Sequence, residues 1–247
     1  MQIFPLSEGS FTIDKTKVFV PFDEDNDTLN QRPTGSLLVE IQPFLIKTKN
    51  DLLLLDTGLG FDADGQLQLH KNIKAAGFNP ADVTKVLMSH LHKDHAGGLA
   101  FGPNNQWLSF SNATYYVQQR ELEAALADGN ASFVREDIEA LHGSHQVHLL
   151  PADEGSINDY ISYQYTGAHS PHHQVFWIKE EGETVFFGGD DAPQLHQMKV
   201  RYKTKYDFEP EKTMNLRQQW WEQGNNAGWT FLFYHDIKTP TYKKAAI

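Results

Sequence analysis

The feature that most constrains this chain is a cluster of metal-ligating side chains directly after a short apolar segment. Residues 89–99 read Ser-His-Leu-His-Lys-Asp-His-Ala-Gly-Gly-Leu, and they follow residues 86–88, which we predict to be a strand. The candidate ligands in this run are His90, His92, Asp94 and His95. A lone histidine is most often solvated or structural, but this density of ligand types indicates a metal site.

The backbone pattern within the cluster suggests how the ligands divide. Alternate residues of an extended backbone share a face, so His90 and His92 are placed to bind one ion. A turn at Lys93 then lets Asp94 and His95 face a second ion, and the following two glycines allow close backbone approach. The chain has no cysteine, which excludes thiolate chemistry and sulfur ligands. Imidazole and carboxylate suit zinc, and also iron, manganese or cobalt.

The same order of strand and then ligand recurs three times along the chain. The three places are residues 162–165 before His169, 184–187 before Asp190 and Asp191, and 230–233 before His235. Ligand sites in layered sheet folds gather at the carboxyl ends of strands, so these loops are expected to converge. Asp190 and Asp191 both follow their strand immediately, and the pattern does not separate them. With one of these two aspartates, the candidate ligands number seven.

The rest of the chain predicts a mixed fold, α/β or α+β. Apolar segments at 37–41 and 52–55 favour strands. Helical periodicity covers residues 67–76, 118–126, 133–141 and 211–223. No repeat or Pro/Ser-rich linker marks a boundary, so we expect one domain over residues 1–247. The segments 23–34 and 97–106 are expected to be surface loops.

Charge and hydropathy argue against a nucleic-acid-binding protein and against a membrane-spanning one. The formal net charge of −11 opposes attraction to phosphate backbones. No apolar run approaches the ~20 residues that span a bilayer, and the N-terminus lacks the regions of a signal peptide. We therefore expect a cytoplasmic protein with a small-molecule substrate and no nucleic-acid or membrane partner. The oligomeric state is left open.

Several motifs together resemble the metallo-β-lactamase superfamily over nearly the whole chain. Asp56-Thr57-Gly58 resembles the early Asp-Thr-Gly turn of the family, and residues 90–95 fit its His-x-His-x-Asp-His signature. Residues 167–173 resemble the segment that supplies the third histidine. Gly189-Asp190 resembles the turn with the bridging carboxylate, and His235 resembles the last ligand. The resemblance implies an α+β fold, namely a four-layer αβ/βα sandwich.

The resemblance also implies a division of the ligands between two divalent ions. By it, His90, His92 and His169 hold the first ion, Asp94, His95 and His235 hold the second, and Asp190 bridges them. Asp190 is thereby favoured over Asp191. The catalytic candidates are Asp94 and Asp190, with Asp190 as a proton shuttle to the leaving group. Zinc is the expected metal, with iron, manganese or cobalt as alternatives.

Residues outside this set receive structural interpretations. Asp56 is expected either to orient a ligand imidazole or simply to form its turn. His173 is expected to be structural, because Pro171 argues against a helix that would align it with His169. His196 is left out of the site. Lys93 is expected to be an exposed cation near a carboxylate.

The branch of the superfamily is indicated by three segments, at residues 189–193, 206–210 and 235–236. They are most similar to quorum-quenching lactonases and their organophosphate-hydrolysing relatives. The expected reaction is hydrolysis of a lactone or related ester by a hydroxide that bridges the metals. The alternatives are a phosphotriesterase, a glyoxalase-type thioesterase, a β-lactamase, or a metal- or ligand-binding protein without catalysis. Pro193 stands where some lactonases place a substrate-contacting tyrosine, so that role is unassigned.

Overall fold

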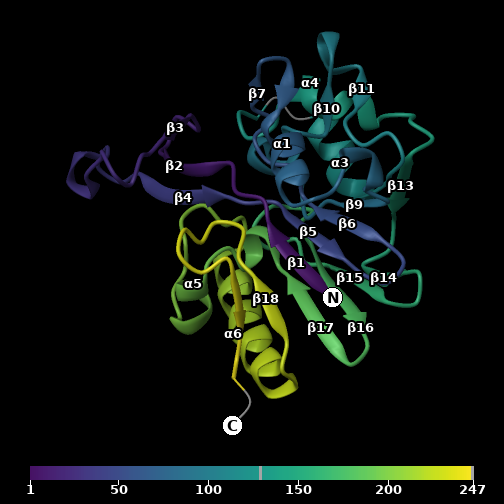
Figure 1. Ribbon diagram of the computed structural model, residues 1–247. Helices are drawn as coiled ribbons and strands as arrows, with labels where there is room; N and C mark the ends of the chain where they lie inside the picture. The colour runs from purple at the N-terminus through teal and green to yellow at the C-terminus, as the bar shows by residue number, and fades with distance from the viewer. Residues whose placement is uncertain (128–129, 246–247) are drawn as a thin grey trace.

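The computed structural model describes residues 1–127 and 130–245 and shows two six-stranded sheets packed face to face, with helices on their outer faces (Figure 1). The first sheet has the order β1-β5-β6-β9-β12-β13, and the strands from β6 onward are parallel. Its strands are β1 (Gln2–Pro5), β5 (Phe44–Lys47), β6 (Leu52–Leu55), β9 (Lys85–Leu87), β12 (Thr114–Gln118) and β13 (Val147–Leu150).

The second sheet has the order β14-β15-β16-β17-β18-β19 and is antiparallel except between β17 and β18. Its strands are β14 (Glu154–Ile157), β15 (Ile161–Tyr165), β16 (Gln174–Glu180), β17 (Glu183–Phe187), β18 (Thr230–Leu232) and β19 (Thr241–Lys243). Strands β15, β17 and β18 run in the same direction, so their carboxyl ends share one edge of the sheet.

The helices complete a four-layer arrangement. The α-helices are α1 (Gln68–Ala75), α2 (Lys93–Ala96), α3 (Gln119–Ala127), α4 (Arg135–Ile138), α5 (Leu195–Lys199) and α6 (Pro210–Ala227). Apolar residues of α1 and α3 pack on the first sheet, and those of α5 and α6 pack on the second. Short two-stranded ribbons join β7 (Asp62–Ala63) to β8 (Gln66–Leu67) and β10 (Ala100–Phe101) to β11 (Trp107–Leu108).

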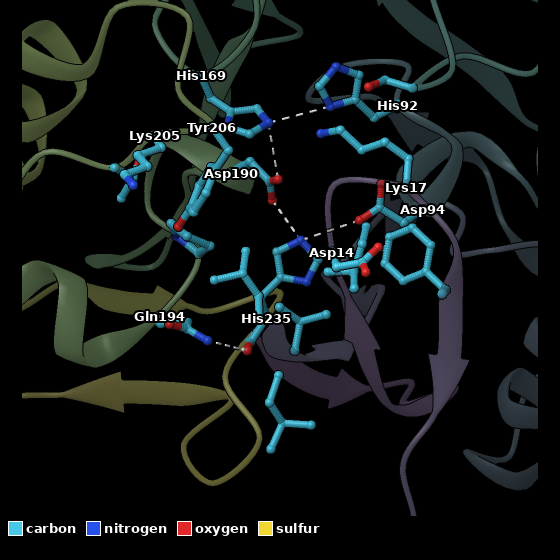
Figure 2. A pocket seen from close by; sticks show the side chains of 18 of the residues that line it. Asp14, Lys17, His92, Asp94, His169, Asp190, Gln194, Lys205, Tyr206 and His235 are labelled. Carbon is cyan, nitrogen blue, oxygen red and sulfur yellow. Dashed lines mark hydrogen bonds and ion pairs between the residues drawn. The ribbon is translucent and has the colours of Figure 1, made fainter. Parts of the chain in front are cut away.

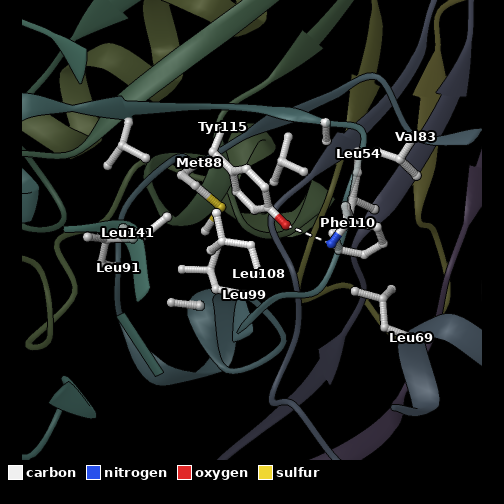
Figure 3. Packing of buried hydrophobic residues seen from close by; sticks show 14 of the residues in the cluster. Leu54, Leu69, Val83, Met88, Leu91, Leu99, Leu108, Phe110, Tyr115 and Leu141 are labelled. Carbon is white, nitrogen blue, oxygen red and sulfur yellow. Dashed lines mark hydrogen bonds between the residues drawn. The ribbon is translucent and has the colours of Figure 1, made fainter. Parts of the chain in front are cut away.

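Strand β6 shows why the core has this layering. All four of its residues are leucines and all are buried, as a strand covered on both faces requires. Leu52 and Leu54 belong to the cluster beneath α1 and α3, and Leu53 and Leu55 belong to the cluster between the two sheets. Figure 3 shows part of the outer cluster, where the Tyr115 hydroxyl accepts a hydrogen bond of 2.9 Å from the backbone N–H of Phe110.

A third sheet projects from the sandwich beside the carboxyl ends of the strands (Figure 1). It has the order β3-β2-β4, with β2 (Gly9–Ile13), β3 (Phe19–Pro21) and β4 (Leu37–Ile41), and we call it the hairpin wall. Its outer residues include exposed Val18 and Val20, whereas Phe11 and Val39 are buried at its base. The hairpin wall therefore has one end in the core and one in solvent.

Most of the predicted elements are confirmed within one to three residues. The segments at 37–41 and 52–55 are β4 and β6, and the helix predicted at 67–76 is α1. The helical pattern at 133–141 divides into α4 and a 3₁₀ turn at Glu139–Leu141. No helix of the described residues has both the length and the apolar character needed to cross a bilayer.

The prediction of a surface loop at residues 97–106 is wrong for its first four residues. Residues 97–100 are buried, and exposure begins only at Phe101. A side chain at Gly97 would meet the Leu59 carbonyl oxygen at 2.3 Å, and one at Gly98 would meet the Thr57 carbonyl oxygen at 2.2 Å. The glycine pair thus allows the ligand loop to pack directly on the backbone of residues 57–60, as expected for close approach.

Candidate metal centre

The structure brings all seven candidate ligands together from four loops. Residues 90–95 follow β9, His169 follows β15, Asp190 follows β17 and His235 follows β18. Figure 2 shows the side chains of His92, Asp94, His169, Asp190 and His235 pointing toward one another at the base of a pocket. The expected convergence at the strand ends is confirmed. We call these seven residues the metal centre, although their role as ligands remains a proposal.

Two groups of ligand atoms lie side by side in the metal centre. One group, with its ligand atoms all within 4.8 Å of one another, is His90, His92 and His169. The other, within the same limit, is Asp94, His95 and His235. Each group has the size and the nitrogen and oxygen donors that suit one divalent ion.

Asp190 lies between the two groups. Its Oδ1 is 3.1 Å from His95 Nε2 and 2.9 Å from His235 Nε2, on the side of the second group. Its Oδ2 is 3.2 Å from His169 Nε2, on the side of the first group. One carboxylate therefore presents one oxygen to each group, which is the arrangement that a bridging ligand requires.

Asp191 points away from the metal centre. Its Oδ1 accepts a hydrogen bond of 2.7 Å from the backbone N–H of His169, and its Oδ2 lies 3.0 Å from His173 Nδ1. The backbone N–H of Asp190 donates to the other ring nitrogen of His173 at 3.2 Å. His173 is fully buried and supports the turn that carries both aspartates, in agreement with its structural interpretation.

Three of the histidines are fixed by a hydrogen bond from the ring nitrogen that faces away from the centre. The acceptors are Asp56 Oδ2 for His95 (2.7 Å), Asp207 Oδ1 for His169 (3.1 Å) and the Glu40 carbonyl for His235 (2.7 Å). The acceptors require a proton on each Nδ1, so each Nε2 faces the centre and offers its lone pair there once the ring is neutral. These contacts orient the ligand atoms before any ion binds.

Asp56 is therefore an orienting residue as well as a turn residue. Both of its oxygens accept hydrogen bonds from Ser89, at 2.7 Å from the backbone N–H and 2.6 Å from the hydroxyl. This contact joins the ends of the parallel strands β6 and β9, at the point where the ligand loop begins. Its φ of 54° shows that the turn holds Asp56 in the left-handed region, which is uncommon for this residue.

The protonation of the centre follows from burial and from Asp190. Burial lowers the pKa of His90 and His92 well below the usual value, and neighbouring imidazoles add to that shift. Burial also opposes the charged forms of His95 and Asp190, but nearby charges outweigh it: Asp190 and Asp94 raise the pKa of His95, and His235, His95 and His169 lower that of Asp190. Asp190 is thus held ionised, the form in which a carboxylate binds metal.

A buried atom of His90 supports a fit between these residues and metal ions. Its Nε2 is enclosed and has no hydrogen-bond partner among the described residues. A buried polar atom without a partner costs free energy, and an ion between the two groups would remove that cost. The donor set therefore fits divalent cations.

Some residues at the site had no role assigned from the sequence. Asp207 holds His169, and it is itself held by Arg217 of α6, whose Nη2 lies 3.3 Å from Asp207 Oδ2. Arg217 also donates from Nε to the backbone carbonyl of Asp191 at 2.7 Å. Asp207 and Arg217 lie ten positions apart in the sequence, a spacing that matches no helix or strand period, so their pairing leaves no signal in the sequence.

The pocket above the metal centre has a volume of about 620 Å³. Its apolar side is the hairpin wall, through Ile13, Phe19 and residues 37–39, and its opposite side includes Tyr202 and Tyr206. Lys93 is half-buried and lines this pocket, so its interpretation as an exposed surface cation is wrong. Pro193 is also part of the lining.

Known proteins share both the fold and the sequence pattern. Residues 40–219 match the family described as the metallo-beta-lactamase superfamily. The N-acyl homoserine lactonase AiiA of Bacillus thuringiensis subsp. kurstaki is 27% identical over 236 residues, covering 87% of this chain and 89% of the relative.

Solved structures share the fold of this chain. A probable metal-dependent hydrolase from Staphylococcus aureus superposes with a TM-score of 0.80 at 22% identity, covering 98% of this chain and 91% of that one. AidC, a dizinc quorum-quenching lactonase, superposes with a TM-score of 0.73 at 19% identity, covering 99% and 90%. The family match spans most of the chain, including the loops that carry six of the seven candidate ligands, and so the chain belongs to the metallo-β-lactamase superfamily.

Proposed function

We propose that this protein is a dinuclear metal-dependent hydrolase that opens lactones. The observation that carries the proposal is the position of Asp190, whose two carboxylate oxygens face two separate groups of ligand atoms. The first ion would be held by His90, His92 and His169, the second by Asp94, His95 and His235, and both would share Asp190. Zinc is the proposed metal, because the donors suit it and the similar AidC is described as a dizinc enzyme.

The choice of a lactone rests on the relatives and on the pocket. Several relatives at 27–32% identity are named N-acyl homoserine lactonases. The pocket places an apolar wall beside the metal centre, which suits a substrate with a hydrocarbon part next to the bond that is cleaved. A substrate of this kind would lie with its ester group at the base and its apolar part on the hairpin wall.

The chain's own residues then have defined tasks in the reaction. When bound, the two ions supply a nucleophilic water of lowered pKa and polarise the carbonyl of the scissile ester. Asp190 and Asp94 are both buried beside the pocket. Asp190 would take a proton from the attacking water and pass it to the departing alkoxide as the ring C–O bond breaks. His95, whose Nδ1 donates to Asp56, would present Nε2 to the second ion.

A substrate panel with a matched inactive variant tests this proposal. Zinc-loaded protein is assayed with N-hexanoyl homoserine lactone, γ-butyrolactone, a phosphotriester, a glutathione thioester and a β-lactam. We expect lactone opening, with weaker or absent β-lactam turnover and loss of activity in His92→Ala. Phosphotriester or thioester cleavage without lactone opening would keep the metallohydrolase but refute the lactonase. Zinc binding without any hydrolysis would favour a binding protein.

A further inference from the structure

The lining of the pocket carries a concentration of positive charge that the metal centre does not explain. Four lysines line it, namely Lys15, Lys17, Lys93 and Lys205. Within residues 1–127 and 130–245, none of their ammonium groups makes an ion pair or a hydrogen bond. Outside the metal centre, the only acidic residue of the lining is Asp14. This lining contrasts with the net charge of −11 of the whole chain.

Lys17 is the lysine most directly placed at the metal centre. Figure 2 shows its side chain extending from the hairpin wall to the space beside His92 and Asp94. It is half-buried, and its charge adds the smallest contribution, after burial, His169 and His95, to the lowered pKa of His92. The ammonium group therefore lies within electrostatic reach of the centre.

The turn between β2 and β3 holds Lys17 in this position. Its backbone N–H donates to the Asp14 carbonyl at 3.1 Å, and its φ of 59° lies in the left-handed region. Glycine or asparagine adopts that region more easily than lysine does. Asp14 makes no ion pair with Lys17, and its Oδ1 accepts hydrogen bonds from the backbone N–H and the hydroxyl of Thr16. A lysine in a strained position without an ion pair indicates a role for its side chain.

We propose that the pocket selects an anionic substrate, a lactone or ester that carries a carboxylate or phosphate group, and that Lys17 binds this group with help from Lys93. The inference rests on the proposed lactonase function and narrows its substrate class. The ammonium groups of Lys17 and Lys93 line the pocket and make no ion pair within the described residues, so they attract an anionic group of a substrate. A neutral acyl homoserine lactone has no such group.

Opening of the lactone ring adds a second anionic group to the molecule bound in the pocket. Water adds to the lactone carbonyl, the ring C–O bond breaks, the alkoxide takes up a proton, and a new carboxylate forms with release of one proton. The product thus carries one more negative charge than the substrate. Lys17 and Lys93 then face two anionic groups, so we expect the ring-opened product to inhibit competitively.

The experiment compares charged and neutral lactones of matched shape. One arm uses 5-oxotetrahydrofuran-2-carboxylate against its methyl ester, and the other uses 6-phosphoglucono-δ-lactone against glucono-δ-lactone. We expect kcat/KM to favour the charged member of at least one pair by about tenfold, as for a hydrogen bond to a charged group. The pair with the larger ratio distinguishes carboxylate from phosphate. The preference should weaken as salt is added.

Two variants of Lys17 separate binding from folding. Lys17→Met removes the ammonium group, and Lys17→Gly removes it while relieving the backbone. Both should lower the preference for the anion about tenfold, mainly through KM, and leave the neutral lactone within about twofold. The control is Lys203→Met, because Lys203 lies outside the pocket lining and pairs with Glu211 at 2.9 Å. It should retain the preference.

Three results would overturn the inference. They are equal rates for charged and neutral lactones, an unchanged preference in both Lys17 variants, and an equal loss on both members of a pair. If no lactone is opened, the proposed function fails, and calorimetric titration of zinc-loaded protein with 2-hydroxyglutarate tests the anion site alone. A Kd raised about tenfold in Lys17→Gly then supports the site, and an unchanged Kd refutes it.

Discussion

The metal centre and the hairpin wall meet at one pocket but are built in opposite ways. The ligands come from loops after β9, β15, β17 and β18, all of them buried or nearly so, and His95, His169 and His235 are each fixed by a second contact. The hairpin wall projects from the sandwich, exposes Val18 and Val20, and holds Lys17 by a turn of its own. One region is enclosed by the core, and the other is attached to it along one edge.

This difference suggests a division of labour between the two regions. A change in the centre disturbs several buried contacts at once, so it should affect metal binding and therefore every substrate. A change on the hairpin wall alters few buried contacts, so it should affect the choice of substrate and leave metal binding intact. The predictions below test this division, beginning with the largest expected effect.

The largest contrast is expected between the two neighbouring aspartates. Asp190→Asn should lower kcat/KM by more than ~100-fold, since a neutral amide binds two dications poorly. Asp191→Asn changes a side chain that contacts the backbone of His169 and the ring of His173 and does not face the ligand atoms, and should cost ~10- to 100-fold. Rates and metal content of both variants are compared with the unmodified protein. Equal losses in the two variants, or a larger loss for Asp191→Asn, would contradict the choice of Asp190 as the bridging residue.

A smaller effect is expected when an orienting carboxylate is changed. Asp207→Asn weakens the contact that fixes His169, so zinc affinity should fall by ~10- to 100-fold. The matched control is Asp153→Asn, because Asp153 is exposed and pairs with Arg120 away from the pocket. Competition with a chelator measures both affinities. An Asp207→Asn protein that keeps the affinity of the control would show that His169 needs no second contact.

Metal retention should depend on pH through three histidines. The negative charges of Asp190, Asp94 and Asp207 outweigh burial and raise the pKa of His95, His169 and His235 above the usual 6.5. These rings must lose protons to bind metal, so zinc affinity should fall as the pH is lowered, and the fall should begin above pH 6.5. Chelator titrations between pH 8 and 6 measure it. An affinity that stays constant over this range would contradict the assigned ligands.

The smallest effect is expected for Glu8, where the sandwich connects to the hairpin wall, and it concerns the free energy of unfolding. Glu8 lies between β1 and β2, accepts a hydrogen bond of 2.7 Å from the backbone N–H of Leu59, and has a buried Oε1 without a partner. Burial raises its pKa to about 7 from 4.5. The folded state then binds the proton more tightly, so this residue lowers the free energy of unfolding as the pH rises from about 4.5 to about 7.

Glu8→Gln keeps an acceptor for Leu59 and removes the titration. Its free energy of unfolding should exceed that of the unmodified protein by about 1 to 3 kcal/mol at pH 8, with little difference at pH 4.5. Urea unfolding of metal-loaded protein at both pH values measures the difference. A constant difference between the two pH values would show that Glu8 does not titrate in the folded protein.

The sequence predicts the metal centre well and the hairpin wall poorly, for a physical reason. His90, His92, Asp94 and His95 lie within one short segment, and the ligands that follow β15, β17 and β18 each stand next to a recognisable strand. The strand that precedes a ligand therefore reports where the ligand will be. The resemblance to a family, rather than the pattern, separated Asp190 from Asp191. In the structure Asp190 faces both groups of ligand atoms, whereas Asp191 contacts His169 N–H and His173.

Residues that act across long separations left no comparable signal. Lys17 reaches the pocket only because the hairpin wall projects over it, and nothing near position 17 indicates this. Lys93 was expected in solvent. Its neighbours along the chain do not show that its backbone N–H donates to the Ser132 carbonyl or that both residues line the pocket. Glu40 holds His235 through a backbone carbonyl, which every residue type possesses. Such contacts depend on the tertiary fold alone.

The most direct test of the central claim is the number of metal ions that the centre holds. Elemental analysis by mass spectrometry is performed on zinc-saturated protein and on Asp190→Asn, each purified without chelator. We expect about two ions per chain in the unmodified protein and about one in Asp190→Asn, because Asp190 presents one oxygen to each group of ligand atoms. An unmodified protein that holds at most one ion under saturating zinc or manganese would contradict this expectation.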